Sequence, residues 1–294
     1  MRLASARATA RVAALAGLGI LATLGTVSCA APLLRLPELP KRPGPSGARA
    51  SDGALVVAEA TAVCRGIRTM TAEMRVSGSA GGQRIPRGRL LVGLAEPDAV
   101  HLDAVAPFGE SIFMFVAKEG RATLLLPRDD RVLENGQPAA VLEAVTGVPL
   151  DAASLRLALT GCADTPGGEP DIQSVGDRWR ILTVGESAQY FERAGRTGPW
   201  RLVAAVHTMT DRAAWQAEYR DFLNGLPRSV RFVSRDGGRP GHFDLALAIS
   251  EVEINTPLPN EAFELRIPPG TDPISLEELR RVGPLGAQGS PDAR

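Results

Sequence analysis

Apolar positions change their period along the chain, and this change predicts where helices and strands lie. Between Ser51 and Ile67, apolar residues recur every three or four positions, which predicts an amphipathic helix. From Met70 the period becomes two, which predicts a half-buried strand. Further strands are expected over 89–95, 100–106, 112–117, 122–126 and 131–133. Turn residues separate these short segments, so they should form an antiparallel meander.

Two short helices are expected to interrupt the strands. Pro138 suits the first turn of a helix that ends at Gly147. Asp151 suits the cap of a second helix, which Gly161 ends. A third short helix is expected near Ser275–Arg281. The helix over 51–67 and the two short helices before Gly147 and Gly161 carry apolar residues on one face and can cover a sheet.

A second meander is expected after a loop over residues 163–177. Its strands are predicted over 179–184, 188–192, 200–208, 214–222, 230–234, 243–254 and 262–267. Residues 283–294 are rich in glycine and proline, and we expect a disordered tail there. Residues 51–282 are therefore interpreted as one globular domain.

Two predicted strands are apolar on both faces, whereas the strands of a meander usually have one polar face. They are LLVGL at 90–94 and IFMFVA at 112–117, so something must cover the second face. We therefore predict an α+β fold in which a strongly curved antiparallel sheet forms an open, unclosed β-barrel of about eleven or twelve strands, with helices plugging one side.

An apolar space can remain between such a plug and the sheet. The candidate residues for lining a ligand cavity are Leu90, Val92, Leu102, Ile112, Met114, Val116, Leu125 and Leu142. Alternation alone does not decide which strand face lines the cavity. The pattern also leaves open whether side chains fill the space.

The first 28 residues have the pattern of an export signal. Arg2, Arg7 and Arg11 precede the uncharged run VAALAGLGILATLGTV at 12–27, and small residues follow. An uncleaved anchor is an alternative, because the apolar stretch becomes long enough to span a membrane if it is counted on to Leu34.

The cleavage site has two interpretations. Thr26-Val27-Ser28-Cys29 resembles a bacterial lipobox, in which the cysteine receives a diacylglycerol and becomes the mature N-terminus. The other interpretation is cleavage after Ala30, which gives a soluble periplasmic protein. Residues 29–50 contain five prolines and are expected to form a tether that reaches roughly 60 Å.

Charge and cysteine content narrow the functional classes. The chain has 33 basic and 33 acidic residues, so it offers no basic surface for nucleic acid. Cys64 and Cys162 remain once Cys29 is set aside. In an exported chain such a pair is expected to form a disulfide, with two separate buried thiols as the alternative.

No motif for catalysis or metal binding is found. His101, His207 and His242 fall in or beside different predicted strands, without a neighbouring nucleophile or metal-ligand partner, so structural roles are expected. There is no G-x-S-x-G elbow and no phosphate-binding loop before a helix. We expect no enzyme and no cofactor, although a site assembled only in three dimensions stays possible.

Residues 54–162 resemble LolB, an outer-membrane lipoprotein family that receives lipoproteins from the periplasmic carrier LolA. The segment APFGE at 106–110 stands where LolB has a protruding Pro-Leu-Gly loop. The stretch VTGVPL at 145–150, with SLR at 154–156 and LTG at 159–161, is similar to the family's helix-turn-helix segment. The second half matches only in strand pattern and in a closing segment at 253–270.

This resemblance implies a protein on the periplasmic face of the outer membrane, anchored by lipid on Cys29. It would bind acyl chains of lipoproteins or lipids, accept cargo from a LolA-like carrier and insert lipoproteins into the membrane. Phe108, held between Pro107 and Gly109, would contact the membrane. The alternatives are Phe108 folded over the rim as a lid, a packed barrel that binds a protein partner, and a soluble carrier.

Overall fold

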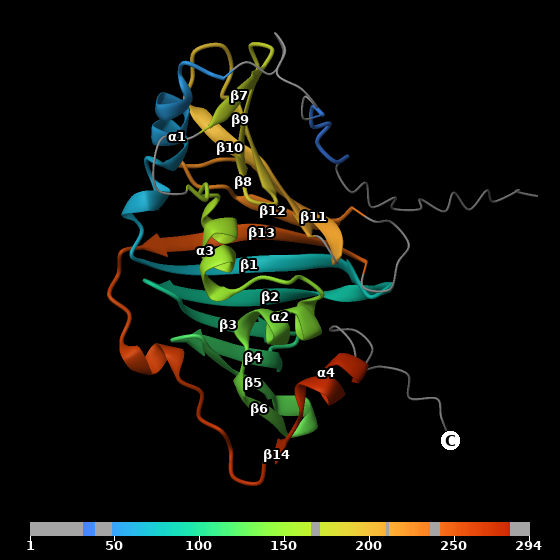
Figure 1. The fold of residues 1–294 in the computed structure, drawn as a ribbon. Helices are drawn as coiled ribbons and strands as arrows, with labels where there is room; N and C mark the ends of the chain where they lie inside the picture. The colour runs from blue at the N-terminus through green and yellow to red at the C-terminus, as the bar shows by residue number, and fades with distance from the viewer. Residues whose placement is uncertain (1–31, 39–48, 166–170, 210–211, 236–241, 283–294) are drawn as a thin grey trace, which may run out of the picture. The chain divides into compact units, whose positions relative to one another are not determined.

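A single sheet of fourteen strands forms the framework of the protein, and its spatial order runs from β14 through β6, β5, β4, β3, β2, β1, β13, β12, β11, β10, β9 and β8 to β7 (Figure 1). The computed structural model describes residues 32–38, 49–165, 171–209, 212–235 and 242–282. The sheet lies within the unit Leu34–Arg294. The prediction of an open, strongly curved sheet with helices on one side is confirmed.

The strands have these bounds: β1 Thr69–Ala80, β2 Gln83–Ala95, β3 Ala99–Val105, β4 Ser111–Lys118, β5 Arg121–Leu126, β6 Arg131–Gly136, β7 Ile172–Val175, β8 Trp179–Val184, β9 Ser187–Arg193, β10 Trp200–Met209, β11 Arg212–Arg220, β12 Ser229–Ser234, β13 Phe243–Ile254 and β14 Asp272–Pro273. Every neighbouring pair is antiparallel except β14 and β6, which are parallel.

The expected number of eleven or twelve strands is too low. β7 lies where a loop was expected, because its four residues are too few to show a period. β14 has only two residues in a proline-rich stretch. The strand expected over 262–267 is absent from the described pairings: Asn260–Phe263 is a 3-10 helix (η3), and Phe263 is buried where η3 contacts β3 and β4.

The long central strands carry the irregularities that let the sheet curve. β1 shifts register between Glu73 and Met74 against β13, and between Val76 and Gly78 against β2. Gly78 has φ +135°, and a Cβ there would lie 1.9 Å from the Asp244 carbonyl oxygen. Only glycine fits this position without displacing the backbone of β13.

The helices are α1 (Gly53–Thr61), α2 (Pro138–Thr146), α3 (Ala152–Thr160) and α4 (Leu276–Val282). Local signals set the bounds of two of them. Pro138 opens α2, and the Asp151 carboxylate accepts a hydrogen bond from the Ser154 amide at the start of α3. Gly147 and Gly161 then end α2 and α3 in the left-handed conformation.

One face of the sheet, here called the inner face, packs against the helices. Val92, Leu102 and Phe115 are cross-strand neighbours on this face. They belong to the same buried cluster as Leu142 of α2 and Leu159 of α3. Figure 1 shows α2 and α3 lying across the sheet, and α4 contacts α2. The opposite face is called the outer face below.

We expect the free energy of unfolding to fall by about 1–2 kcal/mol at pH 7 in Asp52→Asn. Asp52 precedes α1, but its carboxylate caps nothing there and accepts hydrogen bonds from Arg180 Nε (2.9 Å) and NH2 (3.1 Å). These bonds lower the pKa of Asp52. The stabilisation is therefore present above about pH 4 and is lost as the pH falls through the lowered pKa. Urea titrations of both chains at pH 7 and pH 3 measure this difference, which should shrink at pH 3.

Candidate functional site

An apolar cavity of about 210 Å³ lies between the inner face and the helices. The sheet contributes Leu90, Leu102, Phe113 and Leu245, among others. The helices contribute Leu142 and Val145 of α2, Leu155 and Leu159 of α3, and Leu279 and Val282 of α4. The side chains in the wall that carry polar groups are Arg89, Arg128, Asp129 and Thr146. The cavity therefore suits a hydrocarbon ligand far better than a polar one.

The cavity volume limits what the site can hold in this conformation. A cavity of about 150 Å³ admits a ring the size of benzene, and pockets for drug-sized ligands begin at about 300 Å³. At about 210 Å³, the cavity has room for a segment of one acyl chain. The rest of a longer chain would lie outside this volume.

The structure places the eight predicted cavity residues at three kinds of position. Leu90, Leu102, Ile112 and Leu142 line the cavity. Val92 lies on the inner face in the core, away from the cavity wall. Met114, Val116 and Leu125 point to the outer face, since Met114 and Leu125 are cross-strand partners and alternate with Phe113, Phe115 and Leu124.

Several lining residues were not predicted. Alternation predicts Ile112 and not its neighbour Phe113, yet a register shift between Ala104 and Val105 lets both line the cavity. The α4 residues Leu279 and Val282 were also missed. Their spacing with Leu276 marks an apolar helix face, so the sequence held a signal for them.

The loop between β3 and β4 presents Phe108 to solvent. The Ala106 amide donates to the Glu110 carbonyl oxygen at 2.8 Å, and the Gly109 amide donates to the Ala106 carbonyl oxygen at 2.9 Å. Gly109 has φ +92°, a conformation that glycine adopts at no steric cost. The Phe108 side chain is 97% exposed, so it does not fold over the rim as a lid.

This loop and the cavity share the same strand ends. Ala104 and Val105 precede the loop, Ile112 and Phe113 follow it, and all four line the cavity. The Arg128 guanidinium bonds Glu110 at the base of the loop at 2.7 Å, and Arg128 also belongs to the cavity wall. Both partners are half exposed or more, so this ion pair adds little stability.

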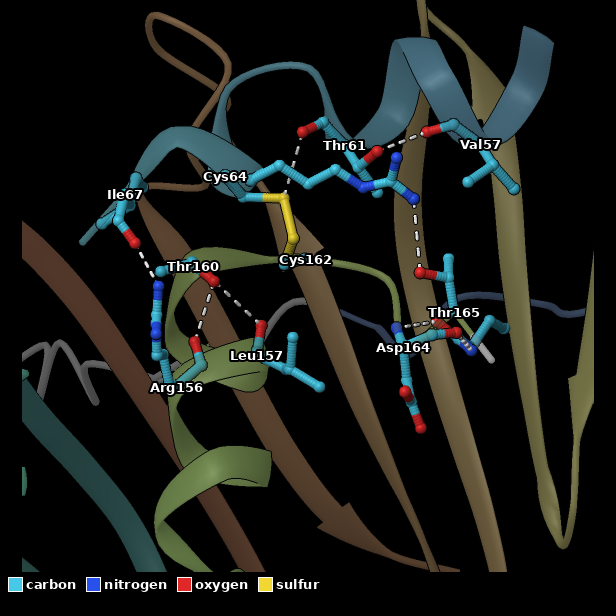
Figure 2. Close-up of a disulfide and its surroundings, with 12 residues drawn as sticks. Val57, Thr61, Cys64, Ile67, Arg156, Leu157, Thr160, Cys162, Asp164 and Thr165 are labelled. Carbon is cyan, nitrogen blue, oxygen red and sulfur yellow. Dashed lines mark hydrogen bonds between the residues drawn. A yellow bond between two sulfur atoms is a disulfide. The ribbon is translucent and has the colours of Figure 1, made fainter. Parts of the chain in front are cut away.

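Cys64 and Cys162 form a disulfide between the 3-10 helix Cys64–Gly66 (η1), which follows α1, and the second residue after α3 (Figure 2). A second contact lies beside it: the Arg156 guanidinium of α3 donates to the Ile67 carbonyl oxygen and bonds Glu96 at 2.9 Å. Leu155 and Leu159 of α3 line the cavity. The disulfide therefore fixes the end of a helix that forms the cavity wall.

The histidines contact nearby groups in the strands and in η3. His101 Nδ1 lies 2.5 Å from the Ala262 carbonyl oxygen, and His242 Nδ1 lies 2.6 Å from Ser234 Oγ. His207 stacks on Trp215, and burial lowers the pKa of His207. In the part of the chain that the structure describes, no three His, Cys, Asp or Glu side chains are grouped as metal ligands.

The structure describes only part of the N-terminal segment on which predictions were made. Cys29, the signal segment and the cleavage sites lie outside the described residues. Among the helices that the structure does describe, none is long and apolar enough to cross a membrane.

The fold and the cavity define a class: an open, curved antiparallel sheet that encloses an apolar cavity with helices. No family model and no curated protein matches the sequence. A LolA superfamily protein from Nitrosomonas europaea is similar in structure over 72% of this chain and 97% of its own, at 10% identity and a TM-score of 0.49.

Two further solved structures are similar with lower scores. One is a putative outer membrane lipoprotein-sorting protein domain from Vibrio parahaemolyticus, at 13% identity, with 72% of this chain and 96% of that one covered and a TM-score of 0.37. The other is the lipoprotein LppX from Mycobacterium tuberculosis, at 12% identity, 71% and 99% coverage and a TM-score of 0.31. The resemblance to LolB stays a prediction.

Proposed function

We propose that this protein binds acyl chains in the cavity and helps to receive lipoproteins and insert them into the outer membrane. One observation carries the proposal: an apolar cavity and a fully projecting phenylalanine lie at the ends of the same two strands. A chain leaving the cavity near this loop would meet the membrane that Phe108 touches. No catalytic step is part of this function.

Two elements would hold the protein at the membrane. Burying the Phe108 side chain contributes roughly 1.5–3 kcal/mol, which is enough for a reversible contact and too little for an anchor. Lipid on Cys29 would supply the steady attachment, because stable anchoring takes more than one weak element. The intact mass of the mature N-terminus separates this anchored form from a soluble carrier cut after Ala30.

The direct test is native mass spectrometry, with lipid extraction, of the mature chain purified from the periplasmic fraction without detergent. A co-purifying acyl ligand is expected and would identify the cargo class. An empty protein that also ignores added lipopeptide would overturn the proposal and favour a structural lipoprotein whose Phe108 loop binds a protein partner.

Filling the cavity is expected to weaken ligand binding by tenfold or more. Leu90 lines the cavity, so Leu90→Trp places an indole where the acyl chain would lie. Leu91 is the matched control, because it lies on the outer face and is 39% exposed. Titration of a fluorescent fatty-acid analogue measures both variants. Equal affinity in Leu90→Trp and Leu91→Trp would place the ligand outside this cavity.

A further inference from the structure

A short segment before the domain is docked on the outer face of the sheet. Residues 34–38, here called the strap, place Leu34 and Leu36 against a second buried cluster that is separate from the main core. This cluster consists of Ile181, Ala188, Tyr190, Ala204 and Val206, from β8, β9 and β10. Ile181 and Ala204 have no exposed surface although they lie on the outer face, so this part of the sheet is covered.

A buried carboxylate fixes the position of the strap. The Glu218 side chain of β11 is 1% exposed, and its Oε1 accepts a hydrogen bond from the Leu34 amide at 2.7 Å. Gln216 Nε2 donates to the same oxygen at 2.7 Å, and Arg220 NH2 bonds Oε2 at 2.9 Å. A carboxylate buried on a sheet face needs such a set of donors. The Leu34 amide is one of these donors, so docking of the strap supplies part of the hydrogen bonding that Glu218 needs.

The chain meets the domain again shortly after the strap. Arg49 forms a bridge with Gln173 of β7, and the Ala50 amide donates to the Ile172 carbonyl oxygen at 2.7 Å. Residues 39–48 therefore run between two points that are both attached to the domain. Their length has no influence on how far the domain lies from the N-terminus.

We propose that the strap sets the distance between the domain and its membrane anchor, an inference that rests on the lipid proposed at Cys29. Five residue steps separate Cys29 from Leu34, and they span at most about 18 Å when fully extended. A free tether over residues 29–50 would reach roughly 60 Å. The strap thus keeps the point at which the chain joins the domain close to the membrane surface.

Two insertions of the same sequence test this proposal. A 20-residue Gly/Ser segment placed between Ala31 and Pro32 should raise the separation between domain and membrane by about 25 Å, its root-mean-square length. The same segment placed after Gly44 should leave the separation unchanged, because both of its ends are held. Energy transfer measures the separation in lipidated chains on vesicles of phosphatidylethanolamine and phosphatidylglycerol. The donor dye is attached at Arg87→Cys, which is exposed, and the acceptor is a labelled lipid headgroup.

The outcomes test the role of the strap and the lipid anchor at Cys29 separately. A fall in energy transfer with the first insertion alone supports the strap. A fall with both insertions, or with neither, overturns it while the chains stay attached to the vesicles. Absence of attachment in every chain overturns the lipid at Cys29, and with it this role of the strap.

Hydrogen exchange tests the docking without any lipid. The Leu34 amide, which donates to buried Glu218, should exchange at least tenfold more slowly than in an unstructured peptide. Leu36→Ser should remove most of this protection, whereas Leu33→Ser should not, because Leu33 is 44% exposed. An unprotected Leu34 amide in the wild-type chain would overturn the docked strap whatever the state of Cys29.

Discussion

Replacing Phe108 with glutamate is expected to lower transfer of a bound lipopeptide into vesicles by about 10- to 100-fold. The side chain is 97% exposed and contributes nothing to the core, so the fold should not change. What is lost is the contact with the membrane, roughly 1.5–3 kcal/mol for a phenylalanine side chain. The carboxylate adds a further cost, because a charge enters the hydrocarbon region unfavourably.

Two control variants make this result specific. Phe108→Leu keeps an apolar side chain and should retain most of the transfer. Leu223→Glu alters another exposed apolar residue, 52% exposed between β11 and β12, and should leave transfer unchanged. The assay follows a fluorescent lipopeptide moving from the protein to vesicles of phosphatidylethanolamine and phosphatidylglycerol. Normal transfer by Phe108→Glu would refute a membrane role for this loop.

Removing the disulfide is expected to lower the free energy of unfolding by about 4–5 kcal/mol, the value for closing a loop of roughly a hundred residues in the chain-entropy model. Cys64 and Cys162 are 98 residues apart in sequence, and the bond restricts the unfolded chain most strongly when this separation is long. Without the bond, the C-terminal end of α3 keeps only its weaker contacts, and the cavity wall loses a fixed point.

Urea titrations with and without reductant measure this effect. The Cys64→Ala/Cys162→Ala double variant should match the reduced wild-type chain and should not respond to reductant. Both cysteines are 9% exposed or less, so reduction requires partial unfolding of the chain first. A loss below about 1 kcal/mol would show that the bond constrains the unfolded chain little. Equal mass with and without reductant after thiol alkylation would show that the two thiols are not paired.

Much of the fold follows from local chemistry. Pro138 and Asp151 start helices that Gly147 and Gly161 end, because these residues satisfy or release backbone groups whatever lies nearby. Alternating apolar residues gave the long strands correctly, since a half-buried strand needs that period. The same rule failed over 262–267, where the chain begins in the 3-10 helix η3 and pairs with none of the named strands.

The site was predictable only in part. Both faces of β4 are apolar, so periodicity could not decide between Met114 and Phe113, and the register with β3 and the helices makes that choice. The sequence predicts only a tether over the strap, because Leu34 and Leu36 are too few to form a periodic apolar pattern. Its partner Glu218 lies 184 residues away, and such a contact leaves no local pattern.

The sequence by itself therefore determined the alternating elements, the caps and turns of the helices, and the Pro-Phe-Gly turn, because each depends on residues a few positions apart. Only the tertiary structure decided which face of the sheet packs on the helices, how much space remains between them, and what covers Glu218. These properties depend on how distant segments pack together, and packing is a property of the whole chain.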